Sequence, residues 1–183
     1  MQLKKICRFT KHVLKLIINK MNKRNYGIDG QFAPELRNIK WVDNQGNETS
    51  RIQLSNFENK FIVIYCFQSW CPGCHSRGLP SLQKMITALK ENNEVVFLAI
   101  QTVFEGKNEN TFEKLNEVKK KYSLEIPFGQ DEGDAFTQNI SSVMYDYRTG
   151  GTPWFIFINK EGKVVFNDFH INTEKAIEYL QTI

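Results

Sequence analysis

Residues 61–80 read FIVIYCFQSWCPGCHSRGLP, and the architecture of this 183-residue chain can be worked out from this stretch. The unbroken apolar run 61–67 predicts a strand that is buried on both faces. Apolar residues at helical spacing begin at Leu79, so a helix is expected after the strand. Cys71 and Cys74 therefore lie at the junction between a buried strand and the start of a helix.

This position gives the two cysteines a specific chemistry. The unpaired N–H groups and the dipole at a helix start favour negative charge, which lowers the pKa of a thiol placed there. Cys71 is the sulfur best placed to feel this effect. Cys74 lies one turn later on the same helix and is within reach to close a disulfide with it. The arrangement is typical of thiol–disulfide exchange.

The composition fits one soluble-type domain with an appendage. Hydrophobic residues make up 41% of the chain, enough for a real core. The net charge of +4 is unevenly placed, because residues 1–28 hold eight Lys or Arg and no Asp or Glu, leaving 16 of the 24 bases to face all 20 acids. The remainder is mildly acidic, so we expect no nucleic-acid partner. Four cysteines are too few for a disulfide-stapled secreted scaffold.

We expect two parts: a basic amphipathic extension at 1–28 and a domain at 29–183. Lysines interrupt the apolar residues of the extension, which predicts no signal peptide, and no stretch approaches the roughly 18 apolar residues that span a bilayer. We therefore expect a cytoplasmic protein. Two alternatives for residues 1–24 are weak contact with an anionic membrane surface and an organelle transit peptide. A frayed or docked extension is the favoured interpretation.

The rest of the chain alternates between strand and helix patterns. Strands are predicted at 39–42, 51–54, 61–67, 95–100, 154–158 and 164–166, and helices after the cysteine pair and at 112–122, 136–143 and 173–180. This order predicts an α/β fold, a mixed sheet with helices on both faces and an added N-terminal hairpin. Thr173 is expected to cap the last helix. Asp131, Glu132 and Asp134 lack EF-hand spacing and are expected in a solvated loop.

Three segments together resemble one family. They are Ala33-Pro34 with the later 54–57 (Leu-Ser-Asn-Phe), the segment 70–74 (Trp-Cys-Pro-Gly-Cys), and 151–154 (Gly-Thr-Pro-Trp) before a hairpin. In this order and at these distances they resemble the thioredoxin superfamily, and more narrowly its redoxin branch related to TlpA and ResA. The resemblance covers about residues 29–183 and implies a thioredoxin-like fold, with a central mixed sheet flanked by helices.

The resemblance also implies roles for matching positions. Cys71 would be the attacking thiolate and Cys74 the resolving thiol. Pro153 would be cis and lie against the disulfide, the Thr152 backbone would pair with substrate, and Trp70 would cover one side of the site. No cofactor beyond the redox-active disulfide is implied. The partners would be a disulfide-containing protein or small thiol substrate and an unidentified recycling reductant or oxidant.

The chain departs from the family where an acid is usual. Tyr65 stands where thioredoxin has a buried Asp, and Arg77 where related reductases often have Glu. His75 is the nearest other titratable base, and His75 and Arg77 could instead add positive potential that stabilises the Cys71 thiolate. Pro72-Gly73, between the cysteines, should influence the redox potential.

Other functions fit parts of the same stretch. Residues 71–75 match the CxxCH haem-attachment pattern, which would require export and an axial ligand. A metal site could draw on Cys66, Cys71, Cys74 and His75, but only two of these are well placed, and we expect no metal. A free Cys66 inside a buried strand is more often a small hydrophobe.

The nearest enzymatic alternative is a peroxiredoxin-like thiol peroxidase. Residues 68–70 lack the Pro and Thr that shape the peroxide pocket in those relatives. From a different class, the domain could be a catalytically weak redox-sensing or binding module. The intact cysteine pair favours the oxidoreductase over both.

Overall fold

The computed structural model describes residues 26–43 and 45–183. They form one seven-stranded mixed sheet in the order β2-β1-β5-β4-β3-β6-β7. The strands are β1 (Ile39–Val42), β2 (Glu48–Thr49), β3 (Phe61–Phe67), β4 (Val95–Thr102), β5 (Phe128–Asp131), β6 (Trp154–Ile158) and β7 (Val164–Asp168). The α-helices are α2 (Leu79–Ala88), α3 (Phe112–Lys121), α4 (Ser142–Tyr147) and α5 (Thr173–Leu180), and short turns of other helix types span Leu54–Phe57, Cys74–Gly78 and Lys107–Glu109.

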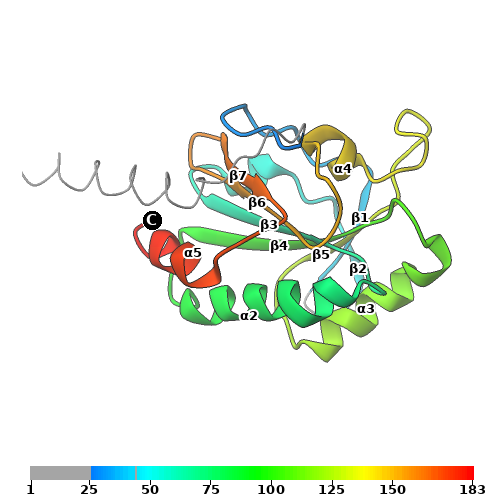
Figure 1. Cartoon of the computed structure of the whole chain (residues 1–183), viewed down its shortest axis with the longest axis horizontal. Coiled ribbons are helices and arrows are strands. Elements are labelled where there is room, and N and C mark those ends of the chain that lie inside the picture. The colour runs from blue at the N-terminus through cyan, green and yellow to red at the C-terminus, as the bar shows by residue number, and fades with distance from the viewer. Residues whose placement is uncertain (1–25, 44) are drawn as a thin grey trace, which may run out of the picture.

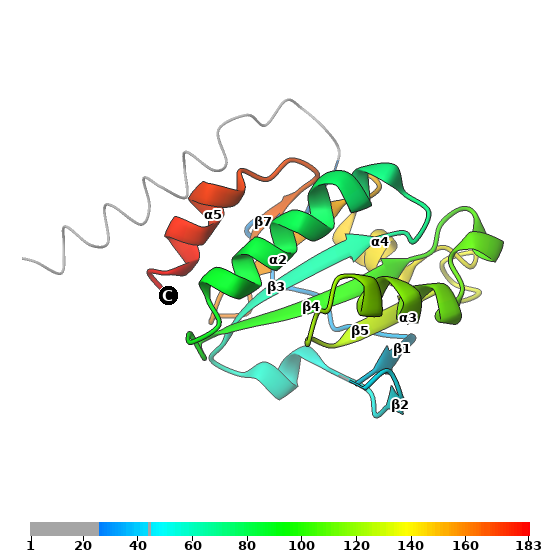
Figure 2. The same ribbon diagram turned by 90° about the horizontal axis from the view of Figure 1, so that it is seen from below.

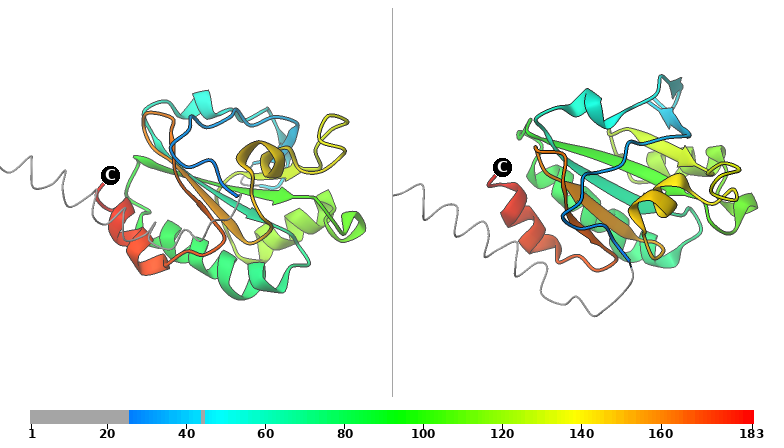
Figure 3. Two further views of the ribbon diagram at one scale, coloured as in Figure 1. Left: turned by 45° about the horizontal axis from the view of Figure 1, so that its top comes forward. Right: turned by 90° about the horizontal axis from the view of Figure 1, so that it is seen from above.

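Helices cover both faces of the sheet, as predicted. Helices α2, α3 and α5 lie below it in Figure 1 and in front of it in Figure 2, whereas α4 lies on the opposite face. The coil 26–38 crosses that opposite face beside α4 (Figure 3). Within the described part of the chain, no helix is long and apolar enough to cross a membrane.

Strand β3 lies in the interior of the sheet, between β4 and β6, and is fully buried, as its apolar run predicts. It pairs in parallel with β4 and antiparallel with β6. Its side chains alternate between two cores: Phe61, Val63, Tyr65 and Phe67 pack on the α2 side, and Ile62, Ile64 and Cys66 on the α4 side. Because β3 is covered on both faces, its carboxyl end is fixed in place, and the cysteine pair follows directly.

The N-terminal hairpin is present, but its second strand is not where we predicted it. The prediction was 51–54; the observed β2 is Glu48–Thr49, and Leu54–Phe57 forms a 3-10 turn. The reason is a tight turn: the Asp43 carboxylate accepts hydrogen bonds from the Gln45 and Asn47 backbone N–H groups. Pairing therefore resumes at once, with Val42 opposite Glu48.

Strand β5 was missing from the predicted order. It contains one apolar residue, Phe128, followed by Gly129, Gln130 and Asp131, yet all four are buried. It is inserted between β1 and β4, so its polar side chains are enclosed by the sheet. Gly129 is required there, because a Cβ would lie 2.5 Å from the Ile39 side chain.

The prediction of a solvated loop at Asp131 was wrong. Its buried carboxylate accepts hydrogen bonds from the backbone N–H groups of Ser142 and Val143 and from the hydroxyls of Ser141 and Ser142. These bonds tie the end of β5 to the start of α4. That helix runs from Ser142, whereas the predicted helix began near Phe136, which is exposed.

The prediction that Thr173 caps the last helix was wrong. Asn172, not Thr173, caps α5, because its side chain accepts from the Lys175 N–H at 3.0 Å. Thr173 instead donates to the Ser81 hydroxyl and links α5 to α2. The basic amphipathic extension predicted at 1–28 lies outside the described residues except for residues 26–28.

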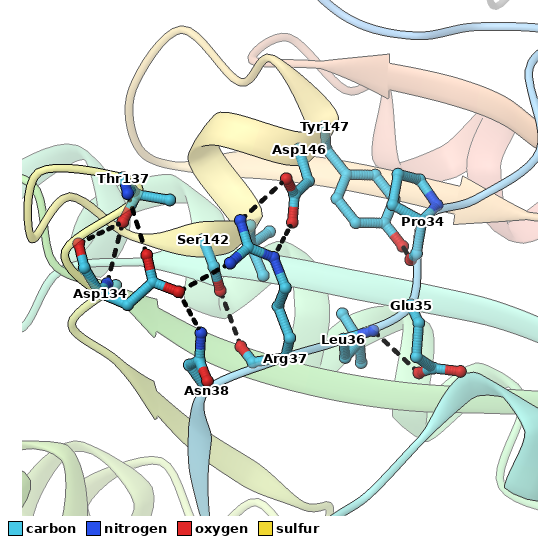
Figure 4. A network of polar contacts seen from close by, with 12 residues as sticks. Pro34, Glu35, Leu36, Arg37, Asn38, Asp134, Thr137, Ser142, Asp146 and Tyr147 are labelled. Carbon is cyan, nitrogen blue, oxygen red and sulfur yellow. Dashed lines mark hydrogen bonds and ion pairs between the residues drawn. The ribbon is translucent and has the colours of Figure 1, made fainter.

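A network around Arg37 ties the N-terminal coil to α4 (Figure 4). The guanidinium contacts Asp146 and Asp134, each at 2.8 Å, and the hydrogen bond to Asp146 raises the Arg37 pKa. The Ser142 hydroxyl donates to the Arg37 carbonyl, and the Tyr147 hydroxyl donates to the Pro34 carbonyl. These contacts fix the coil that leads into the N-terminal strands β1 and β2 to helix α4.

We predict that Asp131→Asn lowers the free energy of unfolding by about 2–4 kcal/mol, because an amide cannot accept all the hydrogen bonds that this buried carboxylate accepts. Urea unfolding followed by tryptophan fluorescence measures the loss. Asp43→Asn, which removes a turn carboxylate at the surface, is the matched control and should cost much less. Equal losses in the two variants would contradict the structural role assigned to Asp131.

Candidate active site

The cysteine pair lies at the carboxyl end of β3, where the chain turns into a helix. The Gln68 carbonyl accepts the Cys71 N–H at 3.1 Å, which closes the turn after the strand. Helical backbone begins at Pro72 and Gly73, and one π-helical turn, Cys74–Gly78, leads into α2. The sequence predicted the strand, the helix and the position of the motif between them.

The two sulfurs differ in exposure and in contacts. Cys71 is 8% exposed and Cys74 is fully buried, and neither is in a disulfide. The backbone N–H of Cys74 donates to the Cys71 sulfur at 3.3 Å, and that sulfur lies 3.6 Å from the Thr152 carbonyl oxygen. The Cys71 sulfur therefore lies between a backbone N–H that donates to it and a backbone carbonyl that accepts from its thiol.

The surroundings of Cys74 favour its protonated form. Burial, followed by the hydrogen bond and charge of Cys71, raises the pKa of Cys74 to about 12. Its thiol therefore keeps its proton at neutral pH. The pair consists of Cys71, which is 8% exposed, and Cys74, which is fully buried and keeps its proton.

Pro153 lies beside this pair, and the Thr152–Pro153 peptide bond is cis. A Cβ placed on Gly73 would be 3.4 Å from the Pro153 ring and 3.9 Å from the Cys71 sulfur. A Cβ on Gly78 would be 2.8 Å from Pro153. The proline segment, distant in sequence, therefore packs directly against the helix turn that carries the cysteines.

Tyr65 occupies the space where the family resemblance implies an acid. It is fully buried, stacks near Phe67 and Phe155, and donates a hydrogen bond to the Cys74 carbonyl at 3.3 Å. Burial raises its pKa well above the ordinary value, so its hydroxyl remains a neutral donor. No Asp or Glu among residues 26–43 and 45–183 hydrogen bonds to either sulfur of the pair.

His75 faces α3 and not the sulfurs. One ring nitrogen lies 2.6 Å from the Ser69 carbonyl oxygen and the other 2.9 Å from the Tyr122 hydroxyl. A carbonyl only accepts, so Nε2 carries a proton in this arrangement. Because both nitrogens are engaged, neither is free to bind haem iron or another metal. Tyr122, which the sequence marked only as a helix residue, holds this ring in place.

The remaining predicted residues surround the motif at the surface. Trp70 is 44% exposed and its indole lies against Gly106. Pro72 and Arg77 are exposed, and the Arg77 guanidinium reaches to 3.9 Å from the position of a Gly73 Cβ. Arg77 thus lies on the same side of Gly73 as the Cys71 sulfur, which is also 3.9 Å from that position.

Sequence reasoning missed a buried polar network beneath the motif. The Ser69 N–H donates to Asn110 at 2.8 Å, and the Ser69 hydroxyl donates to Gln101. Gln101 donates in turn to Gln130, which donates to the Asn110 carbonyl. The available signal was Gln101, a polar residue directly after the apolar run 95–100, whereas no local pattern marked Gln130. The network fixes the loop between β3 and the cysteines.

Cys66 is a bystander to this geometry. It is fully buried on the α4 side of β3, and burial raises the pKa of its thiol. Among the residues with described positions, no group of three or more His, Cys, Asp or Glu side chains could hold a metal ion.

Comparison with known proteins agrees with the fold. The family model described as Redoxin matches residues 29–180. The chain belongs to the Redoxin family. The resemblance to the thioredoxin superfamily and its redoxin branch is thereby confirmed, as is the thioredoxin-like fold. No match was found among curated proteins.

Solved structures with the same fold include three that cover most of the chain. The thioredoxin-like superfamily protein SPOA0173 is 29% identical, with a TM-score of 0.72, covering 84% of this chain and 96% of its own. A thiol-disulfide isomerase from Corynebacterium glutamicum is 22% identical, with a TM-score of 0.65 and coverages of 88% and 97%. The thioredoxin domain of a thiol-disulfide oxidoreductase from Bacteroides vulgatus is 18% identical, with a TM-score of 0.62 and coverages of 85% and 96%.

We predict that iodoacetamide at pH 8 labels Cys71 and leaves Cys74 unlabelled in the folded, reduced protein. The raised pKa of Cys74, about 12, means that its thiolate is scarce until the pH approaches that value. Peptide mass spectrometry after a timed quench measures the labelling of each site. Unfolded protein, in which all four cysteines should react, is the control; equal labelling of Cys71 and Cys74 in the folded protein would contradict the assignment.

We predict that Gly78→Ala destabilises the protein by about 1–3 kcal/mol, since overpacking a filled core forces neighbours to move. The added methyl group would lie 2.2 Å from the Tyr65 hydroxyl and 2.8 Å from Pro153. Gly73→Ala is the matched control, because its methyl group meets nothing closer than 3.4 Å. Chemical unfolding of both variants measures the difference, and a loss for Gly78→Ala no larger than for the control would show that the packing is looser than described.

Proposed function

We propose that the protein is a thiol–disulfide oxidoreductase that works through Cys71 and Cys74 and needs no bound cofactor. The observation that carries the proposal is the unequal state of the two sulfurs beside Pro153. Cys71 is 8% exposed and its sulfur accepts a hydrogen bond from a helix-start N–H, whereas Cys74 is fully buried and protonated at neutral pH. The names of the structural neighbours from Corynebacterium glutamicum and Bacteroides vulgatus support the same chemistry.

The proposed reaction runs in two exchanges. The Cys71 thiolate attacks one sulfur of a substrate disulfide, forming a mixed disulfide and expelling the other substrate sulfur as a thiolate. Cys74 then attacks the Cys71 sulfur, closes the Cys71–Cys74 disulfide and releases the second substrate thiol. Two electrons pass from the pair to the substrate. The Cys74 proton ends on one substrate sulfur, and the other substrate sulfur takes up from water the proton that Cys71 released on ionising. Run in reverse, the same steps oxidise a dithiol.

The proton of Cys74 requires an acceptor, and no carboxylate in the described chain contacts that sulfur. We propose that the departing substrate thiolate takes this proton, directly or through water. Tyr65 is excluded as the base because its neutral hydroxyl already donates to the Cys74 carbonyl. The substrate is then a protein or small-molecule disulfide, and a separate reductant or oxidant restores the pair.

We predict that Cys74→Ser accumulates a mixed disulfide through Cys71 when it is mixed with a model disulfide, because the resolving sulfur is missing. Intact mass spectrometry without reductant measures the adduct. Cys71→Ser is the matched control and should give no adduct at Cys74, which is buried.

Two results would contradict this assignment. In the first, Cys71→Ser forms an adduct on Cys74 as fast as Cys74→Ser forms one on Cys71. Cys74 could then act as the attacking sulfur, contrary to the assignment. Peroxide consumption by the wild-type protein that is faster than disulfide reduction would favour the thiol peroxidase instead.

A further inference from the structure

A groove of about 290 Å³ lies beside the active site, on the α2 and α5 side of Pro153. Its apolar floor is formed by Pro153, Phe155, Phe169 and Ile171. Three basic side chains, Arg77, Lys84 and His170, lie along its exposed rim, together with Ser76 and Ser81. None of the described residues that line the groove is acidic.

Two residues that line the groove, Pro153 and Arg77, also lie near the Cys71 sulfur. Pro153 lies in the groove and next to Gly73, whose Cβ position is 3.9 Å from the Cys71 sulfur. The Arg77 guanidinium is 3.9 Å from that same position. A substrate whose sulfur reaches Cys71 can therefore place the chain that carries it over Pro153 and against Arg77.

The positive charge of the groove is poorly neutralised. Within residues 26–43 and 45–183, Arg77 has no hydrogen-bond or ion-pair partner. Lys84 approaches Glu174 only at 4.0 Å, and both side chains are highly exposed, so that pair is weak.

The cleft on the other side of the motif has a different charge. It is lined by Trp70 and His75, and its four charged residues balance: Glu109, Lys114, Glu117 and Lys121. Lys114 and Glu117 are paired at 2.9 Å. The dithiol thus lies between a basic groove and a charge-balanced cleft, so an anionic group next to the reacting disulfide is favoured on the Pro153 side.

We infer that this groove binds a carboxylate-bearing segment of the disulfide substrate, with Arg77 and Lys84 contacting the carboxylates and the floor covering the short chain between them and the sulfur. The inference rests on the proposed function and narrows its substrates to anionic disulfides. The volume suits a segment of a few residues, either a small thiol conjugate or an acidic peptide within a protein. In both cases the shared chemistry is a carboxylate close to the disulfide.

A simpler role for Arg77 gives a different pattern. If Arg77 acted only on the Cys71 thiolate, its loss would change the rates of all disulfides by the same factor. Recognition of substrate charge instead changes the ratio between anionic, neutral and cationic disulfides. The ratio is therefore the decisive quantity.

The experiment measures the rate constant of the reduced protein with three small disulfides at low and high salt. They are oxidised glutathione, which is anionic, hydroxyethyl disulfide, which is neutral, and cystamine, which is cationic. The variants are Arg77→Gln, Lys84→Gln and, as a charge-matched control, Lys90→Gln, whose exposed side chain lies beyond the far end of α2.

We expect the wild type to prefer oxidised glutathione over cystamine and to lose this preference at high salt. Arg77→Gln should lower the ratio of the glutathione rate to the neutral rate by about fivefold, and Lys84→Gln by less, while Lys90→Gln leaves it unchanged. A ratio that Arg77→Gln leaves unchanged would overturn the inference while leaving the oxidoreductase intact. Failure to reduce hydroxyethyl disulfide would instead overturn the proposed function, and this inference with it.

A second arm separates the two sources of the carboxylate. The disulfide-linked dimer of a synthetic peptide, Asp-Cys-Glu, is compared with that of Gln-Cys-Gln in the same variants. If the acidic dimer is preferred over the neutral dimer more strongly than oxidised glutathione is preferred over hydroxyethyl disulfide, the substrate is a protein segment. The reverse order indicates a small thiol conjugate. Either result supports carboxylate binding in the groove. Equal rates for the two dimers in the wild type would contradict it.

Discussion

The close packing of Pro153 against the helix turn that follows β3 is the constraint on which the site depends. Gly78 has no room for a methyl group between Tyr65 and Pro153. This contact joins two segments that are far apart in sequence and sets Thr152 beside Cys71. Strand β3, buried on both faces, holds one half of the contact, and β6, its antiparallel neighbour, holds the other. The sheet therefore fixes the distance between the cysteines and the proline segment.

Given that geometry, burial separates the properties of two chemically identical side chains. Cys74 is enclosed by the core and its pKa rises to about 12. The sulfur of Cys71, three residues earlier, accepts a hydrogen bond from the Cys74 N–H, and Cys71 is 8% exposed. Tyr65 adds to this enclosure where relatives are expected to have an acid. We propose that Cys74 loses its proton only after the substrate has reacted with Cys71. The attack of Cys74 on the mixed disulfide then depends on the substrate thiolate that left in the first exchange.

Much of this could be predicted from the sequence, because the relevant signals are local. The apolar run 61–67, the helical spacing after Leu79 and the hairpin at 154–166 lie in continuous segments whose periodicity reflects their burial. Strand β5 could not be found in this way, since its sequence, Phe-Gly-Gln-Asp, is polar and is buried only because β1 and β4 enclose it. The burial of Asp131 could not be predicted for the same reason, because its hydrogen-bond partners lie at the start of α4. The engagement of His75 by Ser69 and Tyr122 also depends on how α3 packs, which no local pattern reveals.

The central claim is that Cys71 and Cys74 form a reversible redox pair. An equilibrium titration of the folded protein in glutathione buffers, read by acid-quenched thiol labelling and mass spectrometry, tests it most directly. The account predicts one two-electron transition that joins Cys71 to Cys74, with a potential in the range of roughly −120 to −270 mV spanned by thioredoxin-fold proteins. If both thiols stay reduced across that range, or if the disulfide that forms involves Cys66, the account is contradicted.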